Sequence, residues 1–147
     1  MTTSIRSRLA AAAVAAALLL AGCTQPAGQD PAAKAAVAYY TSRDTRTAEQ
    51  CDFEWKYRND TDGLASCKAD PGGGYSSITG MEVVRATDLA GPDGGPGKAL
   101  AIKMTLKEGS AVYAVAMAQA DGRWYWVKEE SLPKVPSTDD ELRAALS

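Results

Sequence analysis

Histidine is missing from this sequence of 147 residues. Histidine is the usual general base near neutral pH and the commonest metal ligand, so its absence excludes Ser-His and Cys-His mechanisms. Charge of one sign is never concentrated either, because 16 basic and 18 acidic residues are spread along the chain without a long run of either. A nucleic-acid surface needs clustered Lys and Arg. We therefore expect no nucleic-acid partner, no metal and no cofactor.

Long hydrophobic runs are equally scarce, and the one present extends from Leu9 to Ala21. It follows the basic residues Arg6 and Arg8, and it is shorter than the ~20 apolar residues that a transmembrane helix needs. A short basic stretch followed by an apolar run of this length is typical of a secretory signal peptide. Residues 1–22 are therefore predicted to be a signal peptide that directs export.

The apolar run ends in L-A-G-C, from Leu20 to Cys23, and this ending resembles the lipobox of bacterial lipoproteins. The resemblance implies cleavage before Cys23 and attachment of diacylglycerol to its thiol. Acyl chains such as palmitate then anchor the protein to the extracytoplasmic face of the cell membrane. Two acyl chains give stable membrane binding, whereas a single chain binds only marginally. Residues 23–30 become a polar tether. The alternative is a secreted protein that is cleaved but carries no lipid.

Cysteine is rare, and Cys51 and Cys67 are the two that remain after Cys23. In an oxidising compartment outside the cytoplasm, an even pair usually forms a disulfide. The bridge would close a loop of about 17 residues and stabilise the domain by roughly 3 kcal/mol. A redox or metal-binding pair is the alternative, but the sequence has neither the C-x-x-C spacing nor a histidine.

The first part of the exported chain has helical periodicity. Asp30 followed by Pro31 is a typical helix start, and apolar residues then recur on one helix face at Ala33, Ala36, Val37 and Tyr40. We predict one helix from Pro31 to about Ser42 and a second, short one over about 48–57. The stretch D-P-G-G-G at 70–74 ends the helical part.

After residue 74 the apolar period changes to two, which is typical of strands. Alternation predicts strands over 78–88, 100–106, 110–119 and 123–129. Asp121-Gly122 is a strong signal for a tight hairpin. Helices followed by an antiparallel meander predict an α+β fold with the helices on one face of the sheet.

The order of these motifs resembles the small actinobacterial lipoproteins of the NTF2-like (cystatin-like α+β) superfamily. The shared motifs are the L-A-G-C signal, A-A-V-A-Y-Y followed by Asp44, the Cys51 and Cys67 pair, and the closing strand D-G-R-W-Y-W-V. The resemblance implies that residues 31–132 form N-terminal helices packed on a curved antiparallel sheet of about four strands, a cone with a pocket at its open end. The short helical region and the C-terminal extension, 133–147, depart from the family pattern.

Enzymes of that superfamily, such as ketosteroid isomerase and scytalone dehydratase, use carboxylates and tyrosines in the pocket. The residues that could supply such groups here, or line a pocket, are Tyr39, Tyr40, Asp44, Tyr57, Trp124 and Trp126. No motif matches position by position, so no catalytic residue is assigned. In the alternative interpretation the aromatic residues pack in the core and Asp44 caps a turn.

These observations favour an envelope lipoprotein with a non-catalytic binding or scaffolding domain. Its expected partners are the membrane, through the lipid, and either an envelope protein or a small apolar ligand. A small isomerase or dehydratase that uses a pocket Asp and Tyr is the alternative. A third interpretation is a domain that serves a larger envelope enzyme in trans, as similar domains serve some penicillin-binding proteins in cis.

Overall fold

The helical region forms where the periodicity predicts it, but in more pieces. A computed structural model describes residues 25–74 and 77–147. Its helices are η1 (Ala27–Gln29), α1 (Pro31–Asp44), α2 (Glu49–Asp52), η2 (Trp55–Tyr57), α3 (Thr61–Ala69) and α4 (Asp139–Ala144). Helix α1 begins as expected, because the Asp30 side chain accepts a hydrogen bond of 2.8 Å from the backbone N–H of Ala32.

The single helix expected over 48–57 is wrong. The backbone leaves helical geometry at Glu54, where φ is −86° and ψ is 124°. Phe53 O accepts a hydrogen bond of 2.6 Å from the N–H of Trp126, and Glu54 forms a parallel bridge with Trp126. Pairing with the edge of the sheet therefore divides the segment into α2 and η2, an effect that local helix signals do not contain.

The strands form one antiparallel meander in the order β1-β2-β3-β4. They are β1 (Ile78–Ala90), β2 (Pro96–Leu106), β3 (Gly109–Ala120) and β4 (Arg123–Leu132), each longer than the alternation predicts. The hairpin at Asp121-Gly122 is confirmed, because both residues have positive φ, 51° and 75°. The predicted α+β fold, with N-terminal helices on a four-strand antiparallel sheet, is confirmed.

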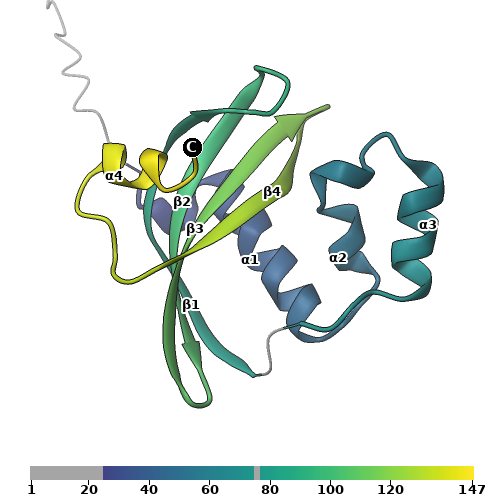
Figure 1. The fold of residues 1–147 in the computed structure, drawn as a ribbon, viewed down its shortest axis with the longest axis horizontal. Coiled ribbons are helices and arrows are strands. Elements are labelled where there is room, and N and C mark those ends of the chain that lie inside the picture. The colour runs from purple at the N-terminus through teal and green to yellow at the C-terminus, as the bar shows by residue number, and fades with distance from the viewer. Residues whose placement is uncertain (1–24, 75–76) are drawn as a thin grey trace, which may run out of the picture.

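Three irregularities in the strand pairing bend the sheet. The register shifts between Ile78 and Gly80 and between Val83 and Arg85 in β1. It shifts again opposite Ala116 and Met117 of β3, where β4 is irregular. Such bulges increase the local twist of a sheet and bend the strand that contains them. The strands accordingly wrap around α1 (Figure 1).

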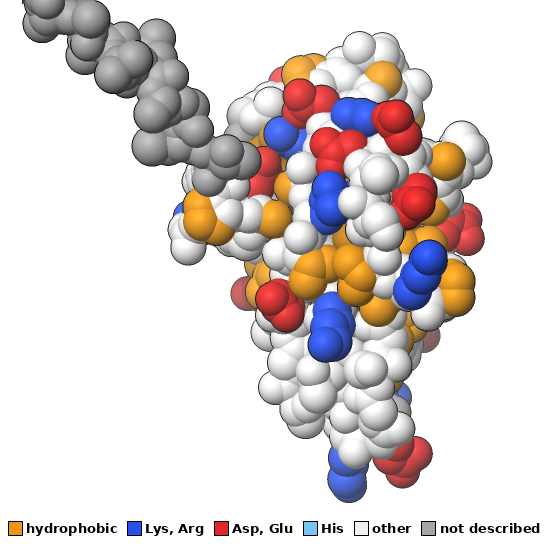
Figure 2. Space-filling view, turned by 90° about the vertical axis from the view of Figure 1, so that its left-hand side faces the viewer, with side chains coloured by type: hydrophobic (Ala, Val, Ile, Leu, Met, Phe, Trp, Pro, Cys, Tyr) orange, Lys and Arg blue, Asp and Glu red, His pale blue; other side chains and the backbone are white. Residues whose placement is uncertain are grey.

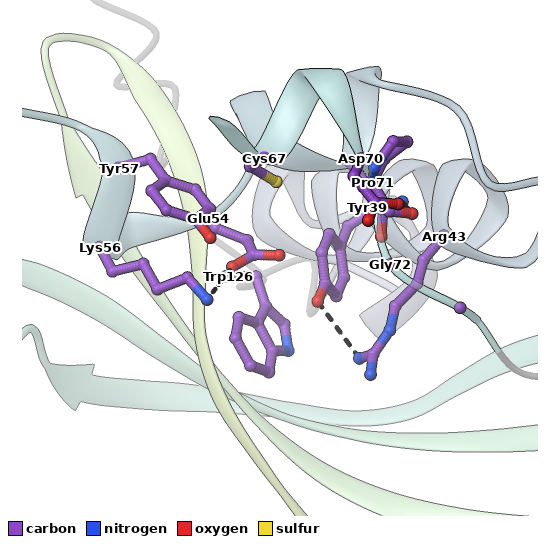
Figure 3. Close-up of a pocket in the computed structure, with 12 residues that line it drawn as sticks. Tyr39, Arg43, Glu54, Lys56, Tyr57, Cys67, Asp70, Pro71, Gly72 and Trp126 are labelled. Atoms are coloured by element: carbon purple, nitrogen blue, oxygen red, sulfur yellow. Dashed lines mark hydrogen bonds and ion pairs between the residues drawn. The ribbon is translucent and has the colours of Figure 1, made fainter. Parts of the chain in front are cut away.

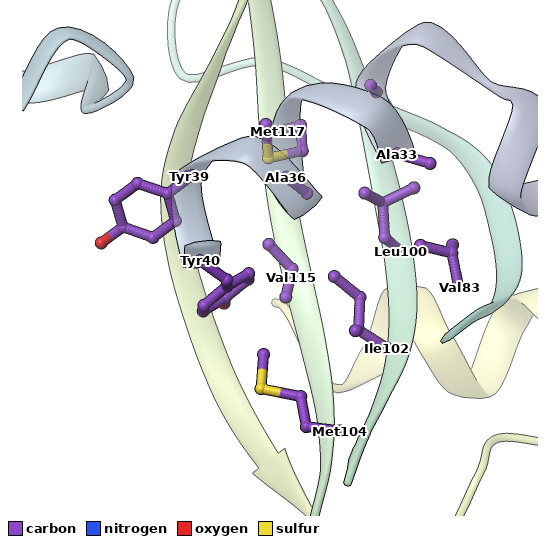
Figure 4. Close-up of a cluster of buried hydrophobic side chains, with 11 residues drawn as sticks. Ala33, Ala36, Tyr39, Tyr40, Val83, Leu100, Ile102, Met104, Val115 and Met117 are labelled. Atoms are coloured by element: carbon purple, nitrogen blue, oxygen red, sulfur yellow. The ribbon is translucent and has the colours of Figure 1, made fainter. Parts of the chain in front are cut away.

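The main core lies between α1 and the sheet (Figure 4). Small residues on α1 allow the helix to approach the strands closely, and larger side chains from β2 and β3 fill the space. The residues at 0–1% exposure are Ala32, Ala33, Ala36, Tyr39, Tyr40, Leu100, Ile102, Met104, Val115 and Met117. The interior of the expected cone is therefore packed with side chains.

The opposite face of the sheet is lined by alanines and covered by α4 (Figure 1). Leu142 and Leu146, at 0% and 4% exposure, pack there against Ala99 and Ala101 of β2. Residues 133–147, expected as an extension of unassigned role, thus fold back onto the domain. Helix α4 covers part of this second face, over β1 and β2.

Two arginines connect this C-terminal segment to β1. Arg85 donates to Pro136 O at 3.3 Å and Ser137 O at 2.8 Å, and its Nη1 lies 2.8 Å from Asp139 Oδ1. Arg143 of α4 donates to Thr87 Oγ1 at 2.6 Å and Asp88 O at 3.0 Å. The C-terminal segment is therefore held by hydrogen bonds to the edge strand β1 as well as by the packing of its leucines on the sheet.

The surface in Figure 2 mixes basic and acidic side chains over its upper part, and its tapered lower end carries few charges. No large region of one sign appears on this face. Within residues 25–74 and 77–147, none of the helices has the length and apolar character needed to cross a membrane.

Candidate functional site

A cleft of about 340 Å³ lies where the helical region meets β4. Tyr39 and Arg43 enter it from α1, and Trp126 enters it from β4. The remaining wall comes from the segment 54–57 and from the turn 70–73 after α3 (Figure 3). The cleft is open on one side, and Tyr39 and Trp126 connect it to the packed core between α1 and the sheet.

Three local connections hold the cleft walls in place. The Phe53–Glu54 segment is bonded to the edge of β4 through Trp126. The predicted disulfide between Cys51 and Cys67 is confirmed, with its two Cα atoms 6.0 Å apart, and it links α2 to α3. Gln50 Nε2 donates a hydrogen bond of 2.8 Å to Pro71 O, which holds the 70–73 turn against α2.

Aromatic rings form the floor of the cleft. The Tyr39 and Trp126 rings are stacked, with centroids 5.1 Å apart and an interplanar angle of 22°. Burial raises the pKa of the Tyr39 hydroxyl, and the nearby Arg43 partly opposes this shift. The indole Nε1–H of Trp126 is buried and has no acceptor among the described residues.

Charges in the cleft are balanced and largely paired. Two cations, Arg43 and Lys56, and two carboxylates, Glu54 and Asp70, line it. Lys56 Nζ lies 2.9 Å from Glu54 Oε2 and 4.6 Å from the centroid of the Tyr57 ring. The hydrogen bond that Lys56 donates to Glu54 raises the pKa of the Lys56 ammonium, so this cation stays charged across the physiological range.

A second pairing joins the cleft to the core. Arg43 Nη1 donates to the Tyr39 hydroxyl at 3.2 Å and lies 3.5 Å from Glu129 Oε1. The other carboxylate oxygen of Glu129 accepts a hydrogen bond from the Tyr40 hydroxyl. The carboxylate facing Tyr40 is therefore neutralised by an arginine, unlike the uncompensated carboxylate that general-base chemistry requires.

The structure brings only some of the predicted pocket residues together. Tyr57 and Trp126 line the cleft, as does Tyr39. Tyr40 is buried in the core, and Trp124 packs against the same core.

Asp44, another predicted pocket residue, does not line the cleft. Its Oδ2 accepts a hydrogen bond of 3.3 Å from the N–H of Ile78 at the start of β1, and its Oδ1 is buried without a hydrogen-bond partner among the described residues.

Arg43, Glu54 and Lys56 are cleft residues that the sequence analysis missed. Arg43 lies one helical turn after Tyr39, so the helix period alone places the two side chains together. Glu54 and Lys56 reach the cleft only because Phe53–Glu54 pairs with β4. No local signal identifies that pairing in advance.

Other hollows lie elsewhere on the molecule, and one of about 670 Å³ at the β1 edge is lined by side chains of both charges, among them Asp30, Arg85, Lys98 and Asp139. A hollow of about 320 Å³ beside α4 is lined mainly by apolar side chains, including Leu89, Val127 and Leu146. Among residues 25–74 and 77–147, no group of three or more His, Cys, Asp or Glu could hold a metal ion. Cys23, the predicted lipidation site, lies outside the described residues.

Comparison with known proteins gives no family to which these features can be assigned. The chain has no significant match to a protein-family model, to a curated protein or to a solved structure.

Proposed function

We propose that this chain is a lipid-anchored protein of the extracytoplasmic membrane face, and that its domain is a non-catalytic binding module. The observation that carries the proposal is the position of the cleft, at the β4 edge of the sheet. The chain enters the domain at the other edge, where η1 lies beside β1. A binding surface on the side away from the anchor is open to a ligand outside the membrane.

The contents of the interior support a role in binding over catalysis. Isomerases and dehydratases of the kind considered above need a pocket that holds substrate against a carboxylate of perturbed pKa. Here the space under α1 is filled by side chains, and Glu129 is paired with Arg43. The isomerase or dehydratase interpretation finds no open carboxylate–tyrosine site in this region.

We also propose that the domain is a reduced relative of the NTF2-like superfamily. A helix lying across a curved four-strand sheet supports this assignment. The family's interior pocket is closed here, and the cleft outside the cone takes its place as the binding surface.

The anchor is tested by metabolic labelling with a fatty acid. Wild-type protein should incorporate label and sediment with membranes, whereas Cys23→Ala should do neither, because no other segment offers a thiol in a lipobox. Ser147→Ala is the control and should label normally. Label that persists in Cys23→Ala contradicts the anchor.

The binding surface is tested by NMR with a panel of charged, polar and apolar small molecules. Molecules that bind should shift the backbone amides of Lys56, Tyr57 and Trp126, leave the turn at Lys107 unchanged and undergo no turnover. Binding confined to the apolar hollow beside α4 would place the function elsewhere. Turnover of a bound molecule would favour the enzyme alternative.

A further inference from the structure

The chemistry of the cleft indicates which class of ligand it accepts. We propose that it binds a short, neutral, polyhydroxylated chain, an oligosaccharide. This inference rests on the proposed binding function and on the cleft of about 340 Å³, which lies at the lower end of the ~300–1,000 Å³ range of small-molecule sites.

The balance of charge argues against a strongly charged ligand. The two cations and two carboxylates that line the cleft cancel. Lys56 is occupied by Glu54 at 2.9 Å, and Arg43 is occupied by Glu129 at 3.5 Å. An anion that enters the cleft must therefore compete with a carboxylate that is already paired with each of the two cations.

The aromatic floor and the polar walls together require an amphipathic ligand. Tyr57 and Trp126 present partly exposed rings, which offer an apolar face with polar edges. A sugar ring has C–H groups on its faces and hydroxyls around its rim, so it matches this arrangement. A fatty acyl chain fits the apolar hollow beside α4 better than it fits this cleft.

Unused hydrogen-bonding groups of both kinds remain around the rings. The Nε1–H of Trp126 is a buried donor without an acceptor among the described residues, and leaving such a donor unpaired is costly. Arg43 lies on the Nε1 side of the indole in Figure 3 and is 27% exposed at its side chain, so a ligand that reaches the N–H must displace this side chain from Glu129. The exposed Asp70 carboxylate supplies an acceptor on the opposite wall. A hydroxyl both donates and accepts, so it can satisfy either group.

An extended peptide is disfavoured by the backbone. Peptides commonly bind by adding a strand to a free sheet edge. At the cleft the edge of β4 is already used, because Phe53 O accepts from the N–H of Trp126 at 2.6 Å. A peptide would have to rely on side-chain contacts alone, whereas a sugar needs no strand pairing.

The test follows the three indole N–H signals of the full-length protein in phospholipid nanodiscs, with ¹⁵N-labelled tryptophan. The probes are the N-acetylglucosamine trimer, decanoate and tetra-alanine. We expect the trimer alone to produce a saturable shift of the Trp126 signal, which Trp126→Phe identifies. Trp126→Phe keeps the stacked ring but removes the donor, so it should weaken trimer binding by about tenfold.

Trp124→Phe is the matched control, because Trp124 packs against the core and does not line the cleft. It should change trimer affinity by less than about twofold. A Trp126 shift with decanoate or tetra-alanine and none with the trimer overturns the saccharide assignment but leaves the binding function standing. No Trp126 shift with any probe, together with small-molecule hits confined to other surfaces, overturns both proposals.

Discussion

Tyr39 shows how one residue can belong to both the core and the cleft. Its neighbour Tyr40 lies on the helix face that the apolar periodicity predicts to be buried, whereas Tyr39 is turned about 100° away. Both are nevertheless at or below 1% exposure, because α1 is covered by the sheet on one side and by Trp126 of β4 on another. A helical period identifies one buried face. It does not predict a second face that is covered by a neighbouring element.

The burial of Tyr39 leads to a prediction about alkaline unfolding. Burial favours the neutral hydroxyl, so its folded-state pKa lies above the ~10 of an unfolded chain. This contribution to the free energy of unfolding is fully present below about pH 10 and is lost as the pH rises toward the folded-state pKa. Tyr39→Phe should therefore show a shallower loss of stability than wild type in urea titrations between pH 9 and 11.5.

Trp124→Phe is the control for this alkaline effect, because Trp124 packs against the same core and has no ionisable hydroxyl. It should keep the wild-type pH dependence. If Tyr39→Phe and wild type lose stability in parallel, the Tyr39 hydroxyl does not ionise with unfolding and the prediction is wrong.

At the scale of elements, the sequence predicts the turns and helix starts that depend on interactions between neighbouring residues. The Asp121-Gly122 hairpin and the start of α1 at Asp30 and Pro31 depend on backbone conformations that those residues favour themselves. The break at Phe53–Glu54 depends on a partner more than 70 residues away, and the helix signals around it are unchanged by that partner. The residues that line the cleft therefore could not be predicted without the tertiary fold.

The disulfide between Cys51 and Cys67 is a covalent link between the helices α2 and α3. Replacing both cysteines, Cys51→Ala with Cys67→Ala, should lower the free energy of unfolding by about 2–4 kcal/mol, because the unfolded chain gains conformational freedom. Amide exchange should also accelerate in α3 more than in β2 and β3, since the bridge joins α3 to α2. Urea titration and hydrogen exchange measure the two effects.

Mass spectrometry of the unreduced exported protein is the companion measurement for the bridge. A mass lower than that of the reduced form by two hydrogen atoms confirms oxidation. Two thiols that react with an alkylating reagent before reduction would contradict it.

Helix α4 has only six residues, so its stability must come from tertiary contacts. Leu142 is fully buried against the alanine-lined face of the sheet. Leu142→Ala should lower the free energy of unfolding by about 2–3 kcal/mol, through lost apolar burial and the cavity left behind. Ala144→Ser, at an exposed position of the same helix, should change it by less than about 0.5 kcal/mol.

Equal effects of these two substitutions in urea titrations would mean that α4 does not pack on the sheet in solution. The result also bears on the role of residues 133–147. A large effect of Leu142→Ala makes the segment part of the folded domain, in agreement with the arginine contacts between this segment and β1.

At the scale of the whole molecule, the sheet separates the entry of the chain from the cleft. Residues at the start of the described chain lie beside β1, near Val84 and Lys98. One row of paired residues crosses the four strands from that edge to the cleft, with one residue on each strand: Asp88, Lys98, Met117 and Trp126. Neighbouring strands lie about 4.8 Å apart, so three such spacings separate the backbones of the two edge strands by roughly 14 Å.

This separation predicts the orientation of the domain on a bilayer. Cys23 precedes Gln25 by two residues, which span at most about 7 Å, so a lipid on Cys23 keeps the β1 edge near the headgroups. A fluorophore attached through Glu82→Cys, on β1, should be quenched by nitroxide-labelled lipid headgroups more than one attached through Lys56→Cys at the cleft. Both side chains are exposed, so the labels report position without disturbing the core. Introducing Cys23→Ala should abolish quenching at both sites, because the domain then leaves the membrane. Stronger quenching at position 56 would mean that the cleft faces the bilayer, and it would contradict a binding surface directed away from the membrane.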